Sequence, residues 1–452
     1  MERMVAALII GIILLVFLIL KTKIHTFLAL ILASIFIGVV GGMPQNDVLT
    51  AITNGFGSTL GSIGIIIGFG VMMGQIFETS GAATRMAYTF IKLFGKGREE
   101  AALSVTGFLV SIPIFCDSGF VILSPLAKAL SKQTKKSVIS LGIALASGLV
   151  ITHSLVPPTP GPVGAAGIFG ANVGSVILWG IVVAIPMMIS SLIYAKYMGK
   201  QIYQLPGDDA QEWIRPENRE ELEKKPIEYS EEGLPGVFTS FAPIVVPIIL
   251  ILLNTVSTAM KIEGTIGGIL VFFGTPIVAV GIGLVIAILT LTKGLDRSFV
   301  ISDMEKGIQS AGIIILVTGG GGALGQVLRD SGVGEYIAGF IANSPIPPIF
   351  LPFLIATLMR FIQGSGTVAM LTAASITAPI MVSLNVDPVF ATLSACIGSL
   401  FFSHFNDSFF WVVNRSLGIV DAKEQIKIWS VTSTIAWAVG FIMLLIINLI
   451  FG

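Results

Sequence analysis

The chain has 452 residues, of which 54% are hydrophobic and 12% charged, and its formal net charge is zero. Soluble domains carry about 25% charged residues, so this composition excludes an ordinary soluble domain and indicates an all-α polytopic membrane protein. The balanced charge gives no support for a nucleic acid partner. No P-loop is present in the sequence, so nothing supports a nucleotide partner either.

Nearly uncharged segments follow one another along the chain, and a spanning helix needs about 20 apolar residues. Such segments lie at 4–20, 26–43, 54–77, 101–127, 137–156 and 172–195, and then at 237–256, 266–292, 307–328, 345–384, 388–406 and 428–451. The stretch 196–235 between them is acidic and contains proline, which predicts a solvated linker. The sequence therefore divides into an N-terminal membrane repeat at 1–195, a cytoplasmic linker at 196–235 and a C-terminal membrane repeat at 236–452.

The two membrane halves share motifs at a constant offset. Gly74-Gln75 recurs 251 residues later as Gly325-Gln326, and His153 recurs at the same offset as His404. Matching halves with polar breaks at membrane depth are how secondary transporters build one midplane site.

The basic residues predict how the halves are oriented. We expect 101–127 and 345–384 to be re-entrant hairpins and 82–95 and 333–343 to lie along the interface, so that each half crosses five times. With the N-terminus outside, 22 of the 26 Lys and Arg residues then fall in inside loops, as the positive-inside rule requires. This arrangement predicts two inverted repeats, a cytoplasmic linker and both termini outside.

Each predicted hairpin is interrupted by a short run of polar and glycine residues, its polar knot. The first is Asp117-Ser118-Gly119 and the second is Gln363-Gly364-Ser365-Gly366-Thr367. Irregular backbone at membrane depth is tolerated only beside protein or a watery cavity. Both knots should place helix N-termini near the bilayer centre, where open amide N–H groups favour an anion.

A predicted helix is also broken in each half. Four prolines and a glycine interrupt the stretch from Thr152 to Pro162, because proline cannot continue a helix. The counterpart from Ser403 to Ser408 is interrupted by polar side chains instead. We interpret the broken helices as facing the hairpin tips around a substrate; the alternative is that the prolines merely end a helix in a loop.

Four segments carry a resemblance that covers nearly the whole chain: the hairpin ending Asp117-Ser118-Gly119, the run from His153 to Pro162, the knot from Gln363 to Thr367 and the segment from Ser403 to Trp411. They resemble the gluconate permease family. Its members are proton-coupled sugar-acid symporters of the wider ion transporter superfamily. The resemblance implies an elevator-type scaffold and transport domain, a homodimer, and uptake of a small organic anion across the cytoplasmic (inner) membrane.

The family tends to have His at the position of Thr159 and glutamate near that of Asp117. This departure makes a shorter hydroxy acid, or an amino-hydroxy acid such as D-serine, an alternative substrate. No cofactor is expected beyond the proton gradient, and sodium coupling is a second alternative, because broken helices also suit Na⁺. The residues expected to bind substrate are Asp117, Ser118, Gly119, His153, Ser154, Thr159, Gln363, Gly364, Ser365, Gly366, Thr367, His404, Asn406 and Ser408.

The ionisable residues suggest how a proton is carried. An ionised carboxylate in apolar surroundings costs several kcal/mol unless it is paired, so Asp407 and Asp117 are candidate proton carriers, Asp407 slightly ahead. His153 and His404 titrate nearest physiological pH, and either could move a proton, bind substrate or simply pack. Arg360 could pair with a substrate carboxylate, pair with a protein carboxylate, or face water.

Three other interpretations of the chain have less support in the sequence than transport. A membrane-embedded enzyme using His404 and Asp407 lacks an activated nucleophile, and a channel would need a continuous lined pore. Gly320-x-Gly322-x-x-Gly325 matches the dinucleotide fingerprint but lies in an uncharged run, which indicates helix packing. Cys116 and Cys396 are expected to be inert buried thiols.

Overall fold

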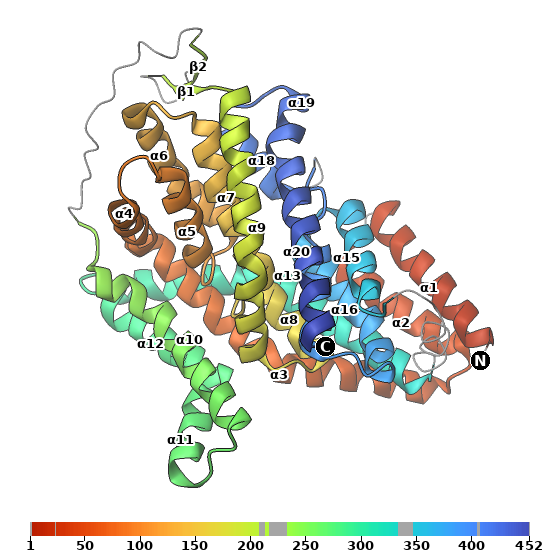
Figure 1. Ribbon diagram of the computed structural model, residues 1–452. Coiled ribbons are helices and arrows are strands. Elements are labelled where there is room, and N and C mark those ends of the chain that lie inside the picture. The colour runs from red at the N-terminus through yellow and green to blue at the C-terminus, as the bar shows by residue number, and fades with distance from the viewer. Residues whose placement is uncertain are drawn as a thin grey trace.

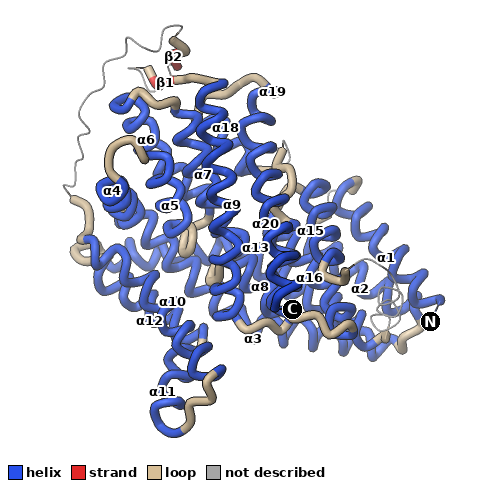
Figure 2. Tube along the Cα trace, viewed as in Figure 1, coloured by secondary structure: helices blue, strands red, loops and turns tan. Residues whose placement is uncertain are grey.

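The computed structural model describes residues 2–22, 24–207, 213–216, 233–332, 347–404 and 407–451. It is built almost wholly from helices (Figures 1 and 2). Those of the first half are α1 (Glu2–Leu20), α2 (Thr26–Gly41), α3 (Gln45–Ser80), α4 (Ala82–Phe94), α5 (Glu99–Val110), α6 (Cys116–Thr134), α7 (Val138–Leu155), α8 (Pro160–Phe169) and α9 (Val173–Gln201).

The second half has its own series of helices, some of which match the first half. They are α10 (Val237–Ala259), α11 (Gly264–Gly274), α12 (Pro276–Leu291), α13 (Arg297–Asp330), α15 (Phe350–Gln363), α16 (Gly366–Ser383), α17 (Pro388–Gly398), α18 (Ser408–Ser416), α19 (Ala422–Gln425) and α20 (Val431–Phe451), with a π-helical turn at Ile426–Ser430. A shift of 251 residues carries the bounds of α3 onto 296–331 and those of α5 onto 350–361, within two residues of α13 and α15. The repeat seen in the motifs therefore extends to the helix boundaries.

The two longest helices, α3 and α13, pack against each other and run crosswise to α9 and α20 in Figure 1. They approach closely because glycines meet at the crossing: a Cβ built on Gly322 would lie 2.6 Å from the carbonyl oxygen of Gly55. Small residues allow such close approach in membrane proteins. The glycine-rich run at 320–325 is thus helix packing, as the sequence predicts.

Helices break beside the first hairpin knot, within the second and at the proline run. α5 ends at Val110 and α6 begins at Cys116, so Asp117-Ser118-Gly119 is itself helical and the break lies just before it, at 111–115. α15 ends at Gln363 and α16 begins at Gly366, and the proline run separates α7 from α8. The peptide bond Pro157-Pro158 within that run is cis.

Two of the predicted apolar segments differ from the structure. The segment 266–292 is not one helix but two, α11 and α12, bent by 65°, because Pro276 cannot donate the helical hydrogen bond and starts a new helix at its N1 position. In 388–406 the helix α17 already ends at Gly398, and short-range bonds such as Leu400 N–H to the Ile397 carbonyl continue as turns.

The linker also differs from expectation where it is described. α9 continues to Gln201, so 196–201 is helical, and two short strands that an all-α fold did not predict, β1 (Leu205–Pro206) and β2 (Trp213–Ile214), pair antiparallel. The ribbon is held by Arg215, which forms two hydrogen bonds of 2.9 and 2.7 Å to the Glu424 carboxylate. The predicted linker residues 208–212 and 217–232 lie outside the described residues.

Three loops meet at one end of the molecule. The Lys136 ammonium donates to the Gly97 carbonyl at 2.9 Å, and the Ser137 hydroxyl donates to the Ile202 carbonyl at 2.9 Å. The loops after α4 and α6 therefore share an end with the start of the linker, as the predicted topology requires. The expected interfacial segment 82–95 corresponds to α4, and 333–343 falls outside the described residues.

Several helices are long and apolar enough to cross a bilayer. Within the described residues five pass by length and composition alone, and up to seven if each bent helix pair counts as one span. Shorter apolar helices, among them Thr26–Gly41 and Pro388–Gly398, accompany them. The chain is therefore a multi-pass membrane protein.

Candidate functional site

A cavity of about 280 Å³ lies where the two hairpin tips and the two helix breaks come together. This volume is near the lower end of the roughly 300–1,000 Å³ typical of small-molecule sites. Ten residues expected from the sequence line it: Asp117, His153, Ser154, Arg360, Gly364, Ser365, Gly366, Thr367, Asp407 and Ser408. Residues from both halves of the chain thus share one polar cavity.

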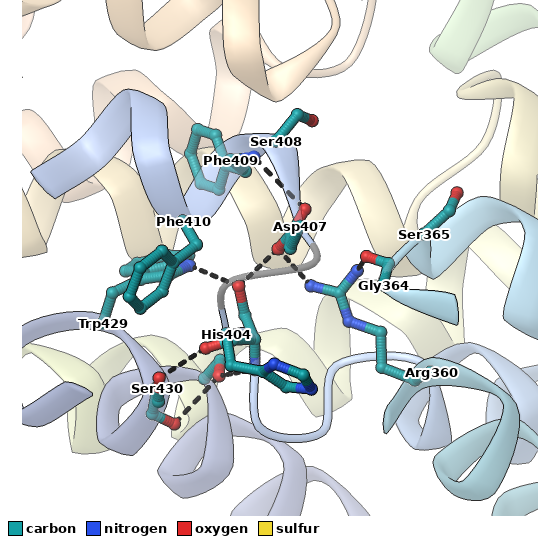
Figure 3. A network of polar contacts seen from close by, with 12 residues as sticks. Arg360, Gly364, Ser365, His404, Asp407, Ser408, Phe409, Phe410, Trp429 and Ser430 are labelled. Carbon is teal, nitrogen blue, oxygen red and sulfur yellow. Dashed lines mark hydrogen bonds and ion pairs between the residues drawn. The ribbon is translucent and has the colours of Figure 1, made fainter. Parts of the chain in front are cut away.

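A buried ion pair forms one wall of the cavity. The Arg360 guanidinium donates through Nη2 to Oδ2 of Asp407 and through Nη1 to the Gly364 carbonyl (Figure 3). Arg360 is 6% exposed and Asp407 7%, so both charges are removed from water. Of the alternatives that the sequence left open for Arg360, contact with a protein carboxylate is the one that the structure contains.

Asp407 accepts hydrogen bonds from two further donors, one on each carboxylate oxygen. The Trp429 indole N–H donates to the Ser403 hydroxyl at 2.9 Å, and that hydroxyl donates to the Asp407 carboxylate. Asp407 is also the N-cap of α18, because its Oδ1 accepts the Phe409 amide at 3.2 Å. Figure 3 shows these contacts converging on one carboxylate, which therefore has a hydrogen-bond donor on each of its oxygens.

Asp117, at the first turn of α6, has a different environment. The Ser408 hydroxyl donates to its Oδ1 at 3.0 Å, and the Cys116 thiol lies 3.6 Å from its Oδ2. Among the described residues it has no cationic partner. The cavity thus contains one carboxylate with a counter-ion and one without.

The two repeat-related histidines lie in different places. His153 lines the cavity, its ring packs 5.6 Å from that of Phe115, and its buried Nδ1 has no hydrogen-bond partner among the described residues. His404 is not among the lining residues: its Nε2 lies 3.0 Å from the Phe361 carbonyl oxygen. The His404 ring thus contacts Phe361 of the second hairpin and also lies 6.0 Å from the ring of Phe402.

Some residues expected at the site do not reach the cavity. Thr159 is buried and its hydroxyl donates to the Val156 carbonyl at 2.6 Å, while Gly119 faces the Leu149 side chain. The structure describes the backbone of Ser118 in α6 and of Gln363 in α15, but not their side chains. Asn406 also lies outside the described residues.

Several lining residues were not expected from the sequence. Cys116, Ser399, Ser403, Trp429 and Ser433 all contribute to the wall. Ser403 begins the predicted polar break at 403–408 but was not among the expected binding residues. Ser399 interrupts an apolar segment, a signal that could have been followed, whereas Trp429 carries no such signal. No group of three or more His, Cys, Asp and Glu side chains able to hold a metal lies within the described part of the chain.

Solved structures share the overall fold. The YdaH transporter of Alcanivorax borkumensis matches with a TM-score of 0.66 over 93% of this chain and 97% of its own, at 13% identity. MtrF of Neisseria gonorrhoeae matches with a TM-score of 0.63 over 94% of this chain and 95% of its own, at 13% identity. Identities this low support the fold alone.

Sequence relatives cover almost the entire chain. A permease of Haemophilus influenzae without an assigned substrate is 47% identical over 99% of this chain and 93% of its own. The high-affinity gluconate transporter of Escherichia coli is 34% identical over 98% of each chain, and the L-idonate transporter of the same organism is 33% identical over 97% and 98%. The model of the GntP family permease matches residues 3–450. Its named members are membrane transporters and not enzymes, and this chain belongs to that family.

Proposed function

We propose that this protein is a proton-coupled symporter that takes up a small organic anion, gluconate or a related sugar acid, across the cytoplasmic membrane. The names of the gluconate and L-idonate relatives support the substrate class. The multi-pass fold and the shared cavity support a transport cycle around one central site.

The proposal of proton coupling rests on the charge of the cavity. Its charged lining residues are two carboxylates, Asp117 and Asp407, and one guanidinium, Arg360. With both carboxylates ionised and His153 neutral, the empty site has a net negative charge, and like charges at close range in a low-dielectric site repel strongly. An organic anion would therefore enter together with a proton that neutralises one carboxylate.

Asp117 is the better placed of the two proton carriers. Asp407 already has a cation and two hydrogen-bond donors, so protonating it would break a buried ion pair. Asp117 has no cationic partner among the described residues, and its side-chain donors there are the Ser408 hydroxyl and the weak Cys116 thiol. We therefore place Asp117 ahead of Asp407, the reverse of the sequence-based order.

The cavity also suits a hydroxylated solute. Hydroxyl groups of Ser154, Ser365, Thr367, Ser399 and Ser408 line it. Such groups donate and accept hydrogen bonds, as recognition of a polyhydroxy chain requires.

The architecture is proposed to be two inverted repeats that form an elevator-type scaffold and transport domain in a homodimer, with the linker cytoplasmic and both termini outside. The 251-residue shift between matching helices supports the duplication. The shared end of the three loops at Gly97, Lys136 and Ile202 supports a first hairpin that enters and leaves the membrane on one side, which the five-crossing arrangement of the first half requires.

Uptake into proteoliposomes tests the function. An imposed inward proton gradient should concentrate radiolabelled D-gluconate above equilibrium, with Na⁺ omitted from both sides. Accumulation only when Na⁺ is present would instead indicate a sodium-coupled carboxylate transporter, and accumulation of D-serine alone would indicate an amino-hydroxy acid transporter. Absence of accumulation of every C3 to C6 sugar acid, with folded protein, would overturn the proposal.

A further inference from the structure

The two hairpin tips face the same cavity but differ in charge. The 251-residue shift that relates the halves places Asp117 at Val368 and Leu109 at Arg360. The first tip therefore has an acid, Asp117, where the second has the apolar Val368. The second tip has a base, Arg360, where the first has the apolar Leu109. A duplicated scaffold thus presents an acidic tip and a basic tip to one cavity.

The basic tip has unused hydrogen-bond donors. Ser365 caps α16 by accepting the Val368 amide at 3.3 Å, and no described residue accepts a bond from the amides of Gly366 and Thr367. The N-terminus of a helix carries a partial positive charge that favours anions.

Arg360 supplies a second, independent indication at the same place. Its side chain lines the cavity and is 6% exposed, and its Nε–H has no hydrogen-bond partner in the described part of the chain. Guanidinium has five N–H donors, and the bonds to Asp407 and Gly364 use only one on each Nη nitrogen. Arg360 can therefore keep Asp407 and still donate to a further anion.

Gly366 brings the helix terminus and the guanidinium together. A Cβ built on Gly366 would lie 3.3 Å from the Ser399 carbonyl oxygen and 3.8 Å from Nη1 of Arg360. The glycine thus leaves a space about the size of a methyl group beside the guanidinium. A side chain at 366 would occupy that space.

We infer that the carboxylate of the transported acid binds at this basic tip, to the amides of Gly366 and Thr367 and the unused donors of Arg360. The hydroxylated carbon chain then extends toward Asp117, Ser408 and His153. This orientation rests on the proposed function, because it assigns the two ends of its substrate. It follows from the charge asymmetry: the second tip offers the Arg360 guanidinium, whereas no described residue gives the first tip a cation.

D-Gluconate and D-glucitol test the assignment, since they differ only in having a carboxylate or a hydroxymethyl group at one end. Binding to the purified full-length protein is measured as a ligand-induced rise in melting temperature, which depends on ligand concentration relative to Kd. The wild type should prefer gluconate by about 10- to 100-fold, the range expected for a charge-assisted hydrogen bond.

The variants separate this tip from the other one. Gly366→Ala should reduce the preference for gluconate over glucitol by about tenfold without loss of folding, whereas Gly268→Ala, where a Cβ meets nothing within 4 Å, should leave it unchanged. Arg360→Lys, which keeps the charge but not the fork of donors, should also reduce it. Asp117→Asn should retain the preference.

Each outcome decides a different claim. If gluconate still binds but Gly366→Ala and Arg360→Lys keep the full preference, the orientation is wrong and the proposed function stands. A rise in the preference for gluconate in Asp117→Asn, with none of the other variants changed, would place the carboxylate at the first tip instead, because the neutral amide no longer repels it. If no C3 to C6 sugar acid raises the melting temperature of the wild type, the proposed function fails, and the orientation fails with it.

Discussion

Ser408 donates a hydrogen bond of 3.0 Å to the carboxylate of Asp117, which lies 291 residues earlier in the chain. The bond joins the first turn of α6 to the first residue of α18. A helix terminus of the second half therefore contacts the acidic tip of the first. A change in the charge of Asp117 would therefore directly alter the hydrogen bond at the start of α18.

Asp117→Asn removes the carboxylate that has no cationic partner while keeping its size. We expect gradient-driven gluconate accumulation to fall at least about tenfold, because the neutral amide cannot take up a proton, and gluconate counterflow to fall much less. Both are measured in proteoliposomes. The exposed carboxylate Asp47 provides the matched control, since Asp47→Asn should leave both activities unchanged. Concentrative uptake at the wild-type level in Asp117→Asn would remove this residue from proton coupling.

Removing one partner of the Arg360–Asp407 pair should destabilise the protein. Asp407→Ala leaves a buried guanidinium without its counter-ion, at a cost of about 3–5 kcal/mol. The expected result is a large fall in the thermal midpoint of the purified protein.

The double variant Arg360→Met with Asp407→Leu distinguishes stability from transport. Replacing both charges by apolar side chains of similar volume is often neutral for stability, so the midpoint should recover much of the loss while gluconate uptake remains absent. Recovery of uptake along with stability would show that the charges act only in folding.

The contacts around Asp407 show why only part of the site can be predicted from sequence. Proline, glycine and serine mark where a helix must end, so the starts of α6 and α16 and the break before Pro160 follow from local composition. The pairing of Arg360 with Asp407 spans 47 residues and no local pattern signals it. Trp429 is a further example, because an indole in an apolar helix usually packs, and its N–H contact with Ser403 depends on tertiary structure.

The two histidines illustrate the same limit. A repeat predicts equivalent positions, yet His153 lines the cavity while His404 lies against the Phe361 carbonyl. Side-chain direction depends on where each helix breaks. α7 stays helical past His153, whereas α17 ends before His404 is reached.

The Trp429–Ser403–Asp407 chain of hydrogen bonds should contribute measurably to stability. Ser403→Ala leaves the buried indole N–H without its acceptor and removes a donor to Asp407, and an unsatisfied buried group costs about 1–3 kcal/mol. Thermal denaturation should show this loss. Trp429→Phe removes only the indole end of the chain, and the double variant should cost less than the sum of the two. Additive effects would mean that the two contacts act independently.

The crossing of α3 and α13 should tolerate no side chain at Gly322. In Gly322→Ala the added methyl would meet the Gly55 carbonyl oxygen at 2.6 Å, and the resulting overpacking costs about 1–3 kcal/mol. Gly57→Ala in α3 is the control, because a Cβ there meets nothing within 4 Å. A lower thermal midpoint only in Gly322→Ala is expected, and equal midpoints would contradict close packing at the crossing.

The membrane orientation can be tested with single cysteines in a protein whose two native cysteines are replaced by serine. Lys136 donates a hydrogen bond to the Gly97 carbonyl, and its neighbour Ser137 donates one to the Ile202 carbonyl. Lys96→Cys and Lys200→Cys, which are close to these contacts in the chain, should therefore lie on the same side of the membrane. The positive-inside rule makes that side cytoplasmic, so a membrane-impermeant maleimide should label both in inverted vesicles and neither in intact cells. Lys261→Cys, in the loop between α10 and α11, should show the reverse pattern. Labelling of Lys96→Cys and Lys200→Cys from opposite sides would rule out the five-crossing half, and with it the inverted arrangement of the two repeats.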